Sequence, residues 1–107
     1  MTKTASAADT PFKLDLHGAF LRRTDLSRAN LTRANLARAD FTNAIFREAD
    51  FKDAILDGTV LKGADLTGTK NLTLSQLRMA ILDETTTLPE GLSLQDVVAG
   101  REQALRP

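Results

Sequence analysis

A large apolar residue recurs at every fifth position of this chain. The series comprises Leu16, Leu21, Leu26, Leu31, Leu36, Phe41, Phe46, Phe51, Leu56, Leu61 and Leu66. Two positions before each of them stands a second residue, which is Ala or Thr in every repeat except the first, where it is Leu14. The residue between the two is often Asp or Asn. An internal repeat of this kind decides the fold class before any other signal.

A period of five fits neither regular element taken alone. In an α-helix, successive repeats would be rotated by about 140°, which would spread the apolar residues around the helix. In a straight strand, five steps invert the side chain, so alternate repeats would face opposite sides of a sheet. A chain that turns a corner in every repeat avoids both problems. The small and large apolar residues then point inward, the Asp or Asn between them points outward, and the remaining two residues form the corner.

The repeats resemble those of the pentapeptide-repeat family. The pattern Ala-Asp/Asn-Leu/Phe-x-x is seen at Ala29-Asn30-Leu31, Ala34-Asn35-Leu36, Ala39-Asp40-Phe41, Ala49-Asp50-Phe51 and Ala64-Asp65-Leu66. The resemblance covers residues 14–72 and implies an all-β solenoid, a right-handed quadrilateral β-helix with four repeats per coil and about three coils. Residues twenty positions apart would then stack on one face at roughly strand spacing, about 4.8 Å.

The length of 107 residues fits one compact domain. We expect a flexible N-terminal segment at 1–11, the β-helix at 12–72, and a C-terminal helical cap and tail at 73–107. The chain contains no cysteine, which excludes disulfides and thiolate metal sites. The segment 1–11 has no apolar core of signal-peptide length, and no later run is long enough to span a bilayer. These features predict a soluble, cytoplasmic protein.

Two helix starts follow the repeats. Thr73 with Gln76 three residues later has the spacing of a capping box, and Leu74, Leu77, Ala80, Ile81 and Leu82 supply an apolar face. Ser93 with Asp96 marks a second helix start. The last coil of a solenoid exposes an apolar cross-section and unpaired strand edges. The segment 73–107 is therefore predicted to cap the column. Residues 72–92 also resemble the helical cap that follows the repeats in many family members.

Fourteen Lys and Arg residues balance fourteen Asp and Glu residues, so the distribution of charge carries more information than its sum. Arg23, Arg28, Arg33 and Arg38 would form a basic belt around one end of the column, reinforced by Arg22. Stacking would place Arg28 beside Glu48 and Arg33 beside Asp53, in exposed ion pairs of small individual value. The belt is therefore either a partly self-neutralised surface or a patch that binds an acidic partner.

Apolar residues replace the outward Asp or Asn at four positions, Phe20, Ile45, Ile55 and Val60. Phe20 and Val60 would lie on one face, and the C-terminal helix could cover Ile55 and Val60. We therefore take Phe20 as a contact residue for another chain. The residues proposed for protein contact are Phe20, Arg22, Arg23, Arg28, Arg33, Arg38 and Val60.

The sequence predicts no catalytic, cofactor-binding or metal-binding residues. His17 is the single histidine and falls at a corner of the first coil, and the Asp residues of the repeats occupy positions that require an outward polar group. No EF-hand spacing or phosphate-binding glycine loop is present. These features favour a protein that is not an enzyme and holds no cofactor.

Three hypotheses for function follow. The first is a protein-interaction scaffold, a small subunit or accessory factor of a larger assembly, with a homodimer through an end of the column or the C-terminal helix as a further option. The second follows from family members that mimic DNA and bind or protect type II topoisomerases such as gyrase. Those members are generally longer and strongly acidic, unlike this chain. Direct binding of nucleic acid ranks third, because Tyr and Trp are absent and three of the five Phe residues point inward. No membrane insertion is expected.

The assigned register predicts opposite outcomes for two substitutions. Phe46→Asp should unfold the column because it buries an unpaired charge, whereas Arg28→Ala should barely change stability because Arg28 is exposed. A chemical denaturation series on both variants checks the register. Two variants as stable as the parent would contradict it.

Overall fold

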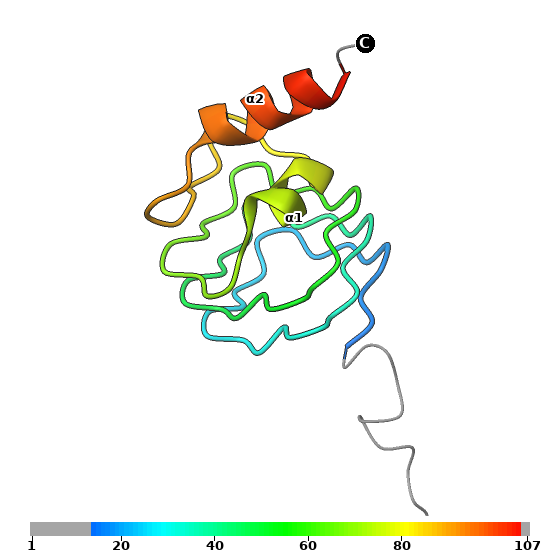
Figure 1. Ribbon diagram of the computed structural model, residues 1–107. Coiled ribbons are helices and arrows are strands. Elements are labelled where there is room, and N and C mark those ends of the chain that lie inside the picture. Colours follow the sequence, from blue (N-terminus) through cyan, green and yellow to red (C-terminus); the bar gives the residue numbers. More distant parts are fainter. Residues whose placement is uncertain (1–13, 106–107) are drawn as a thin grey trace, which may run out of the picture.

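The computed structural model describes residues 14–105, so the expected flexible segment 1–11 lies outside the described residues. From residue 14 the backbone winds into a column in which residues twenty positions apart form parallel β-bridges. Figure 1 shows these coils as stacked loops that lead up to the two helices. Since twenty residues are four repeats, the column has four faces. The predicted stacking of residues twenty positions apart is thus confirmed.

We name each face by the outward residues that stack on it. Face A carries Asp15, Asn35 and Ile55; face B carries Phe20, Asp40 and Val60; face C carries Asp25, Ile45 and Asp65; face D carries Asn30, Asp50 and Lys70. The first coil is residues 14–33 and the second is residues 34–53. The large inward residues of the first two coils donate their N–H groups to the following coil, as Leu31 does to the carbonyl of Asp50 at 2.9 Å. The backbone pairing between coils therefore fixes the register of every face.

Each corner between two faces is a four-residue turn. The N–H of Ala34, for example, donates to the carbonyl of Leu31 at 2.9 Å. The third residue of the turn has a positive φ angle, as a type II turn requires. These third residues are Gly18, Arg23, Arg28, Arg33, Arg38, Asn43, Glu48, Asp53, Gly58, Gly63 and Gly68. This conformation costs a residue with a Cβ atom about 1 to 2 kcal/mol. The arginines thus occupy positions that glycine would occupy with less strain.

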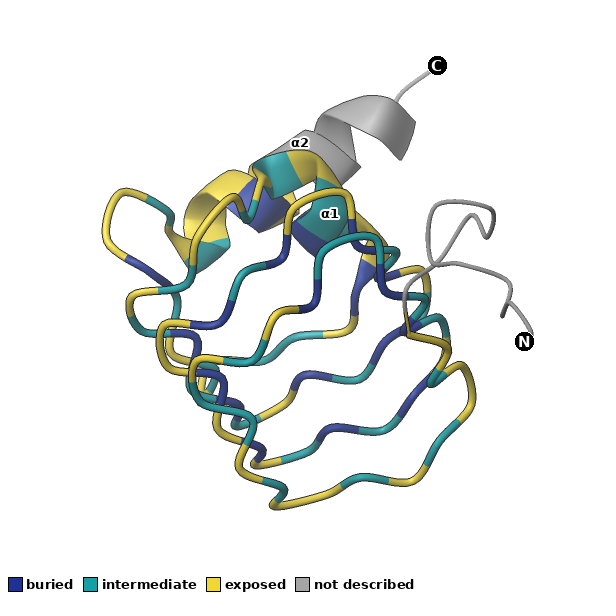
Figure 2. Cartoon of the chain, turned by 90° about the horizontal axis from the view of Figure 1, so that it is seen from below, coloured by how far each residue is buried: buried dark blue, intermediate teal, exposed yellow. Residues whose placement is uncertain are grey.

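The core is built from the inward residues of the second and later coils. Phe41, Phe46 and Phe51 are fully buried on three successive faces. Their ring centroids lie 5.0 Å apart for the first pair and 5.3 Å for the second, which is typical of aromatic packing. Leu16 and Leu21 of the first coil are only partly buried. Figure 2 shows the buried segments alternating with exposed corners around the column. Burial is therefore least complete in the first coil.

Helix α1 spans Leu74–Met79 and begins at the predicted capping box. The side chain of Thr73 accepts the N–H of Gln76, and the side chain of Gln76 accepts the N–H of Thr73. The Gln76 amide also donates to the carbonyls of Phe51 and Ala54, at 2.8 and 2.9 Å. One side chain thus starts the helix and satisfies two carbonyls at the edge of the column.

The prediction that Ile81 and Leu82 continue the apolar face of this helix was wrong. The helix ends before Ala80, whose backbone is extended. Ile81 forms a parallel bridge with Val60, donating its N–H to Thr59 and accepting the N–H of Leu61, both at 2.8 Å. These bonds satisfy edge groups of the column that a longer helix would leave unpaired.

The chain returns once more to the column before the second helix. Thr87 bridges Asp65, so the chain between the two helices also pairs with the repeats. Helix α2 spans Leu94–Leu105 and starts where predicted, with the N–H of Asp96 donating to the Ser93 side chain at 3.2 Å. Leu77 of α1 and Val97 of α2 are buried in the same apolar cluster as the repeats. Both helices lie at the end of the column away from residue 14 (Figure 1).

We expect Gln76→Ala to lower the free energy of unfolding by about 2 kcal/mol, because it removes half of the capping box and leaves two carbonyls without their donor. Urea denaturation measures this loss. Gln95→Ala, at an exposed position of α2, is the control and should cost much less. Equal losses in the two variants would contradict a sealing role for the Gln76 amide.

Candidate interaction surface

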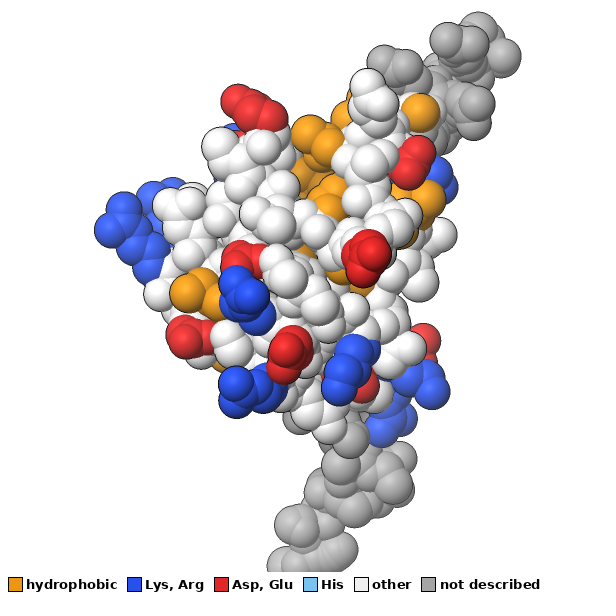
Figure 3. All heavy atoms as spheres, turned by 90° about the vertical axis from the view of Figure 1, so that its left-hand side faces the viewer, with side chains coloured by type: hydrophobic (Ala, Val, Ile, Leu, Met, Phe, Trp, Pro, Cys, Tyr) orange, Lys and Arg blue, Asp and Glu red, His pale blue; other side chains and the backbone are white. Residues whose placement is uncertain are grey.

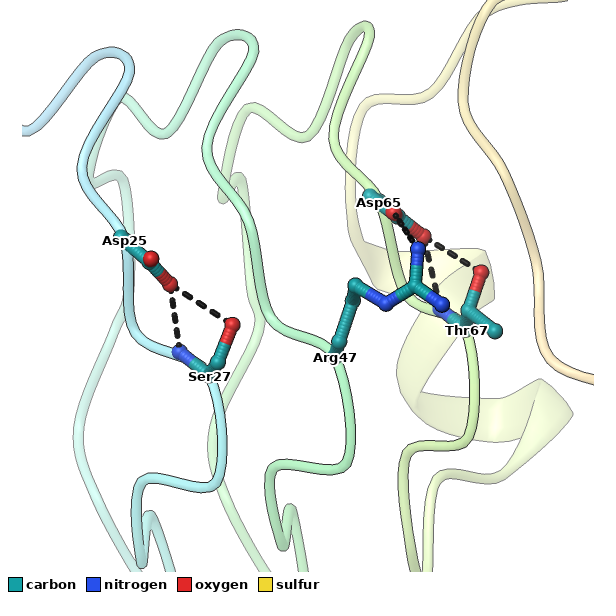
Figure 4. Close-up of polar contacts among 5 residues, drawn as sticks. All are labelled: Asp25, Ser27, Arg47, Asp65 and Thr67. Atoms are coloured by element: carbon teal, nitrogen blue, oxygen red, sulfur yellow. Dashed lines mark hydrogen bonds and ion pairs between the residues drawn. The ribbon is translucent and has the colours of Figure 1, made fainter.

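The outward Asp and Asn side chains stabilise the corners of the column through hydrogen bonds to the backbone. Each of them accepts the backbone N–H of the residue two positions on, as Asn35 does from Ala37 at 3.1 Å. Figure 4 shows this contact for Asp25 with Ser27 and for Asp65 with Thr67, where the hydroxyl of Ser27 or Thr67 donates to the same oxygen. Such side-chain turns favour the corner geometry that follows. These carboxylates therefore serve the scaffold, as predicted from their position in the repeat.

Hydrogen bonding lowers the pKa of several outward carboxyls. The hydroxyl of Thr42 and then the guanidinium of Arg22 lower the pKa of Asp40 from 3.8 to about 2. Burial raises the pKa of Asp65, but hydrogen bonds from Thr67 and the charge of Arg47 outweigh it and leave that pKa lowered. The pKa values of Asp15, Asp25, Asp50 and Asp83 are lowered as well, mainly by hydrogen bonds from neighbouring side chains. All of these groups remain ionised near neutral pH.

Two arginines reach across to the next coil. Arg22 contacts Asp40 with Nε and Oδ2 2.7 Å apart, and Arg47 contacts Asp65 with Nη1 and Oδ2 3.3 Å apart. Both pairs are separated by eighteen residues, so a search for opposite charges at this spacing would have found them in the sequence. The pairs predicted from the sequence, by contrast, join corner residues at a spacing of twenty. Figure 3 shows basic and acidic side chains interspersed over one side of the column, whereas hydrophobic side chains gather near α2.

The corner arginines of the predicted belt differ in whether they form ion pairs. Arg28 pairs with Glu48 as predicted, with Nε and Oε1 3.5 Å apart between exposed side chains. The predicted stacking of Arg33 and Asp53 brings no ion pair between them in the described part of the chain. Arg23 and Arg38 likewise make no ion pair with any described residue. Most of the charge on the belt is therefore not neutralised by stacking.

Phe20 is the most exposed large apolar side chain in the described part of the chain, with 77% of its surface accessible. It lies on face B, where the guanidinium carbon of Arg22 is 5.2 Å from the centroid of its ring. Face B is bordered by the corner of Arg38 on one side and by the corner of Arg23 on the other. Four of the predicted contact residues, Phe20, Arg22, Arg23 and Arg38, thus lie on face B or at the corners that border it.

The other predicted contact residues lie elsewhere. Arg28 and Arg33 occupy the two corners that do not border face B. Val60 shares face B with Phe20, as predicted, but is half-buried beside Ile81. Of the remaining outward apolar residues, Ile55 is half-buried and Ile45 is 36% exposed. Phe20 is therefore more exposed than any of the other three.

His17 contacts Asp15 on the exposed surface of the first coil, with Nδ1 and Oδ1 2.9 Å apart. Within residues 14–105, no group of three or more His, Asp or Glu side chains is placed to hold a metal ion. No helix in the same range is long and apolar enough to cross a membrane.

Comparison with known families gives a match to pentapeptide repeats, in eight copies, over residues 14–47 and 44–83. The chain belongs to the pentapeptide-repeat family. Proteins of this family are right-handed quadrilateral β-helices and are generally non-enzymatic structural or interaction modules. The family thus accounts for the four faces and for the corner in every repeat. A search of curated proteins finds no match.

Two solved pentapeptide-repeat structures resemble this one. HetL, a protein of Nostoc sp. strain PCC 7120 involved in the regulation of heterocyst differentiation, has 32% sequence identity and a TM-score of 0.56. The match covers 73% of this chain but only 35% of HetL. The protein alr5209, also from Nostoc PCC 7120, has 28% identity and a TM-score of 0.56, over 78% of this chain and 76% of alr5209. These similarities support the shared fold.

The lowered pKa of Asp40 predicts acid sensitivity. The folded pKa lies below the unfolded value, so the stabilisation is present above about pH 4 and is lost as the pH falls towards about 2. Asp40→Asn keeps the acceptor for the corner but cannot ionise, so it should lose less stability than the parent between pH 5 and pH 2. Urea denaturation across this range measures the difference. Asp57→Asn is the control, because Asp57 is exposed and makes no side-chain hydrogen bond to any described residue, and this variant should lose as much stability as the parent. A loss in Asp40→Asn equal to that of the parent would contradict the stabilising role of ionised Asp40.

Proposed function

We propose that this pentapeptide-repeat protein is a non-enzymatic protein-interaction module, a small subunit or accessory factor of a larger assembly. The observation that carries the proposal is the exposure of Phe20 at an outward position that Asp or Asn occupies in most repeats. The Arg22 guanidinium lies over the ring and most of the remaining surface faces water, so a partner that covered Phe20 would gain from burying apolar area. Backbone pairing of the first coil with the second holds the ring at a defined place on face B, where a partner can cover it.

The proposal includes a column of about three coils with a C-terminal helical cap. Its support is the burial of Leu77 and Val97 against the repeats and the bonds from Gln76 to the column edge. A capped end cannot add a further coil, because its edge groups are already paired. The surfaces left for a partner are then the four faces and the first coil.

DNA mimicry is the alternative function, in which the protein would bind a type II topoisomerase. Such a mimic needs a surface dominated by carboxylates, because the enzyme's DNA site attracts phosphates. This chain has no net charge, and Arg23, Arg33 and Arg38 carry positive charge without an ion pair to a described residue. These observations favour the interaction module.

Affinity capture of the tagged full chain from lysate of its native cells, at moderate salt and read by mass spectrometry, tests the proposal. We expect one protein complex to be enriched with the parent chain and to be reduced with Phe20→Asp. Enrichment of gyrase or topoisomerase IV would favour the mimic instead. A parent chain that enriches no protein over an untagged control would contradict the interaction module.

A further inference from the structure

The face B patch consists of Phe20, Arg22, Arg23 and Arg38. Phe20 projects from the middle of the face in the first coil, and Asp40 stacks next to it in the second. Arg22 covers the ring and at the same time contacts Asp40 at 2.7 Å, so its charge is already matched. Arg23 and Arg38, at the two corners, have no such partner among the described residues. The patch thus presents an apolar ring on a face whose two bordering corners carry arginines without an ion pair to a described residue.

The two corner arginines are not needed for the backbone. Gly18 and Gly58 occupy the same corner as Arg38 one coil before and one coil after it, with the same positive φ. Gly63 occupies the same corner as Arg23, two coils further on. Glycine adopts this conformation without strain. The two arginines therefore strain the backbone, and no ion pair with a described residue offsets that strain. A role in binding would explain their presence.

We propose that the face B patch binds an acidic segment of a partner protein, with an apolar side chain on the ring of Phe20 and carboxylates on Arg23 and Arg38. This inference rests on the proposed function and names the chemistry of the partner. Guanidinium groups bind carboxylates through paired, charge-assisted hydrogen bonds, and an apolar residue between two acidic ones matches the arrangement of the patch.

Two other occupants fit less well. A nucleic acid laid along face B would find a single ring, Phe20, where a nucleic-acid surface usually stacks several bases. A second copy of this chain, placed patch to patch by a two-fold axis, would bring Arg23 and Arg38 against the same positive charges. An acidic protein segment meets neither obstacle.

The repeats supply matched variants. The test variant is the double substitution Arg23→Gly and Arg38→Gly, and the control variant is Arg28→Gly and Arg33→Gly. Both lose two positive charges, and both introduce glycine at corners with positive φ, so both should fold. Only the test variant changes corners that border face B. Phe20→Asn replaces the ring by a residue that the chain itself uses at the outward position, as at Asn30.

The probe is a short synthetic peptide in which glutamates flank a central leucine, titrated into the ¹⁵N-labelled full chain at low salt and followed by NMR. We expect shift changes concentrated on the residues of the face B patch. Affinity should fall about tenfold in the test variant and in Phe20→Asn, and less than about twofold in the control variant. A peptide with lysine in place of glutamate should not bind.

Equal weakening in the test and control variants would overturn the inference, because it would show attraction to net charge alone. Absence of binding, or tighter binding of a DNA duplex of equal charge, would overturn it too. The failure of this inference is distinguishable from failure of the proposed function. Capture of a protein complex that Phe20→Asp leaves intact would retain an interaction module while removing face B as its surface.

Discussion

Backbone hydrogen bonds between successive coils hold the structure together. The large inward residues of the first two coils donate to the following coil, and corner residues do the same, as Arg28 does to the carbonyl of Arg47 at 2.8 Å. These bonds require every coil to have four repeats and every corner to have the same shape. The short outward Asp and Asn side chains support that shape by accepting the N–H that follows. Side chains on a face are therefore spaced by the backbone, and their identities can change without moving it.

The register could be predicted because the repeat period excludes both the helix and the straight strand. The pattern also located the starts of both helices, since Thr73 and Ser93 are typical N-cap residues in typical spacing. The end of α1 could not be predicted in the same way. Ile81 fits an apolar helix face as well as a strand, and the choice depends on unpaired groups of Thr59 and Leu61 that exist only once the column has formed.

The contact residues were predicted as a list, and the three-dimensional arrangement separates them. In the sequence, the corner arginines form one regular series. In space, Arg28 has Glu48 as a partner, Arg23 and Arg38 border the exposed ring, and Arg33 lies at a corner away from it. The contact between Arg22 and Asp40 was missed because we considered only neighbours twenty residues apart. An arginine side chain is long enough to reach an acidic residue two positions away from its stacked neighbour.

The partial burial of Leu16 and Leu21 has a dynamic consequence. In a stack of coils, each coil is stabilised by its neighbours, and among the described residues the first coil has one neighbouring coil. Local opening should therefore start at the first coil and become rarer towards the helices. Phe20, Arg22 and Arg23 belong to that first coil. A ligand bound there would suppress its opening, so that recognition by this protein and the ordering of its least stable segment would be thermodynamically linked.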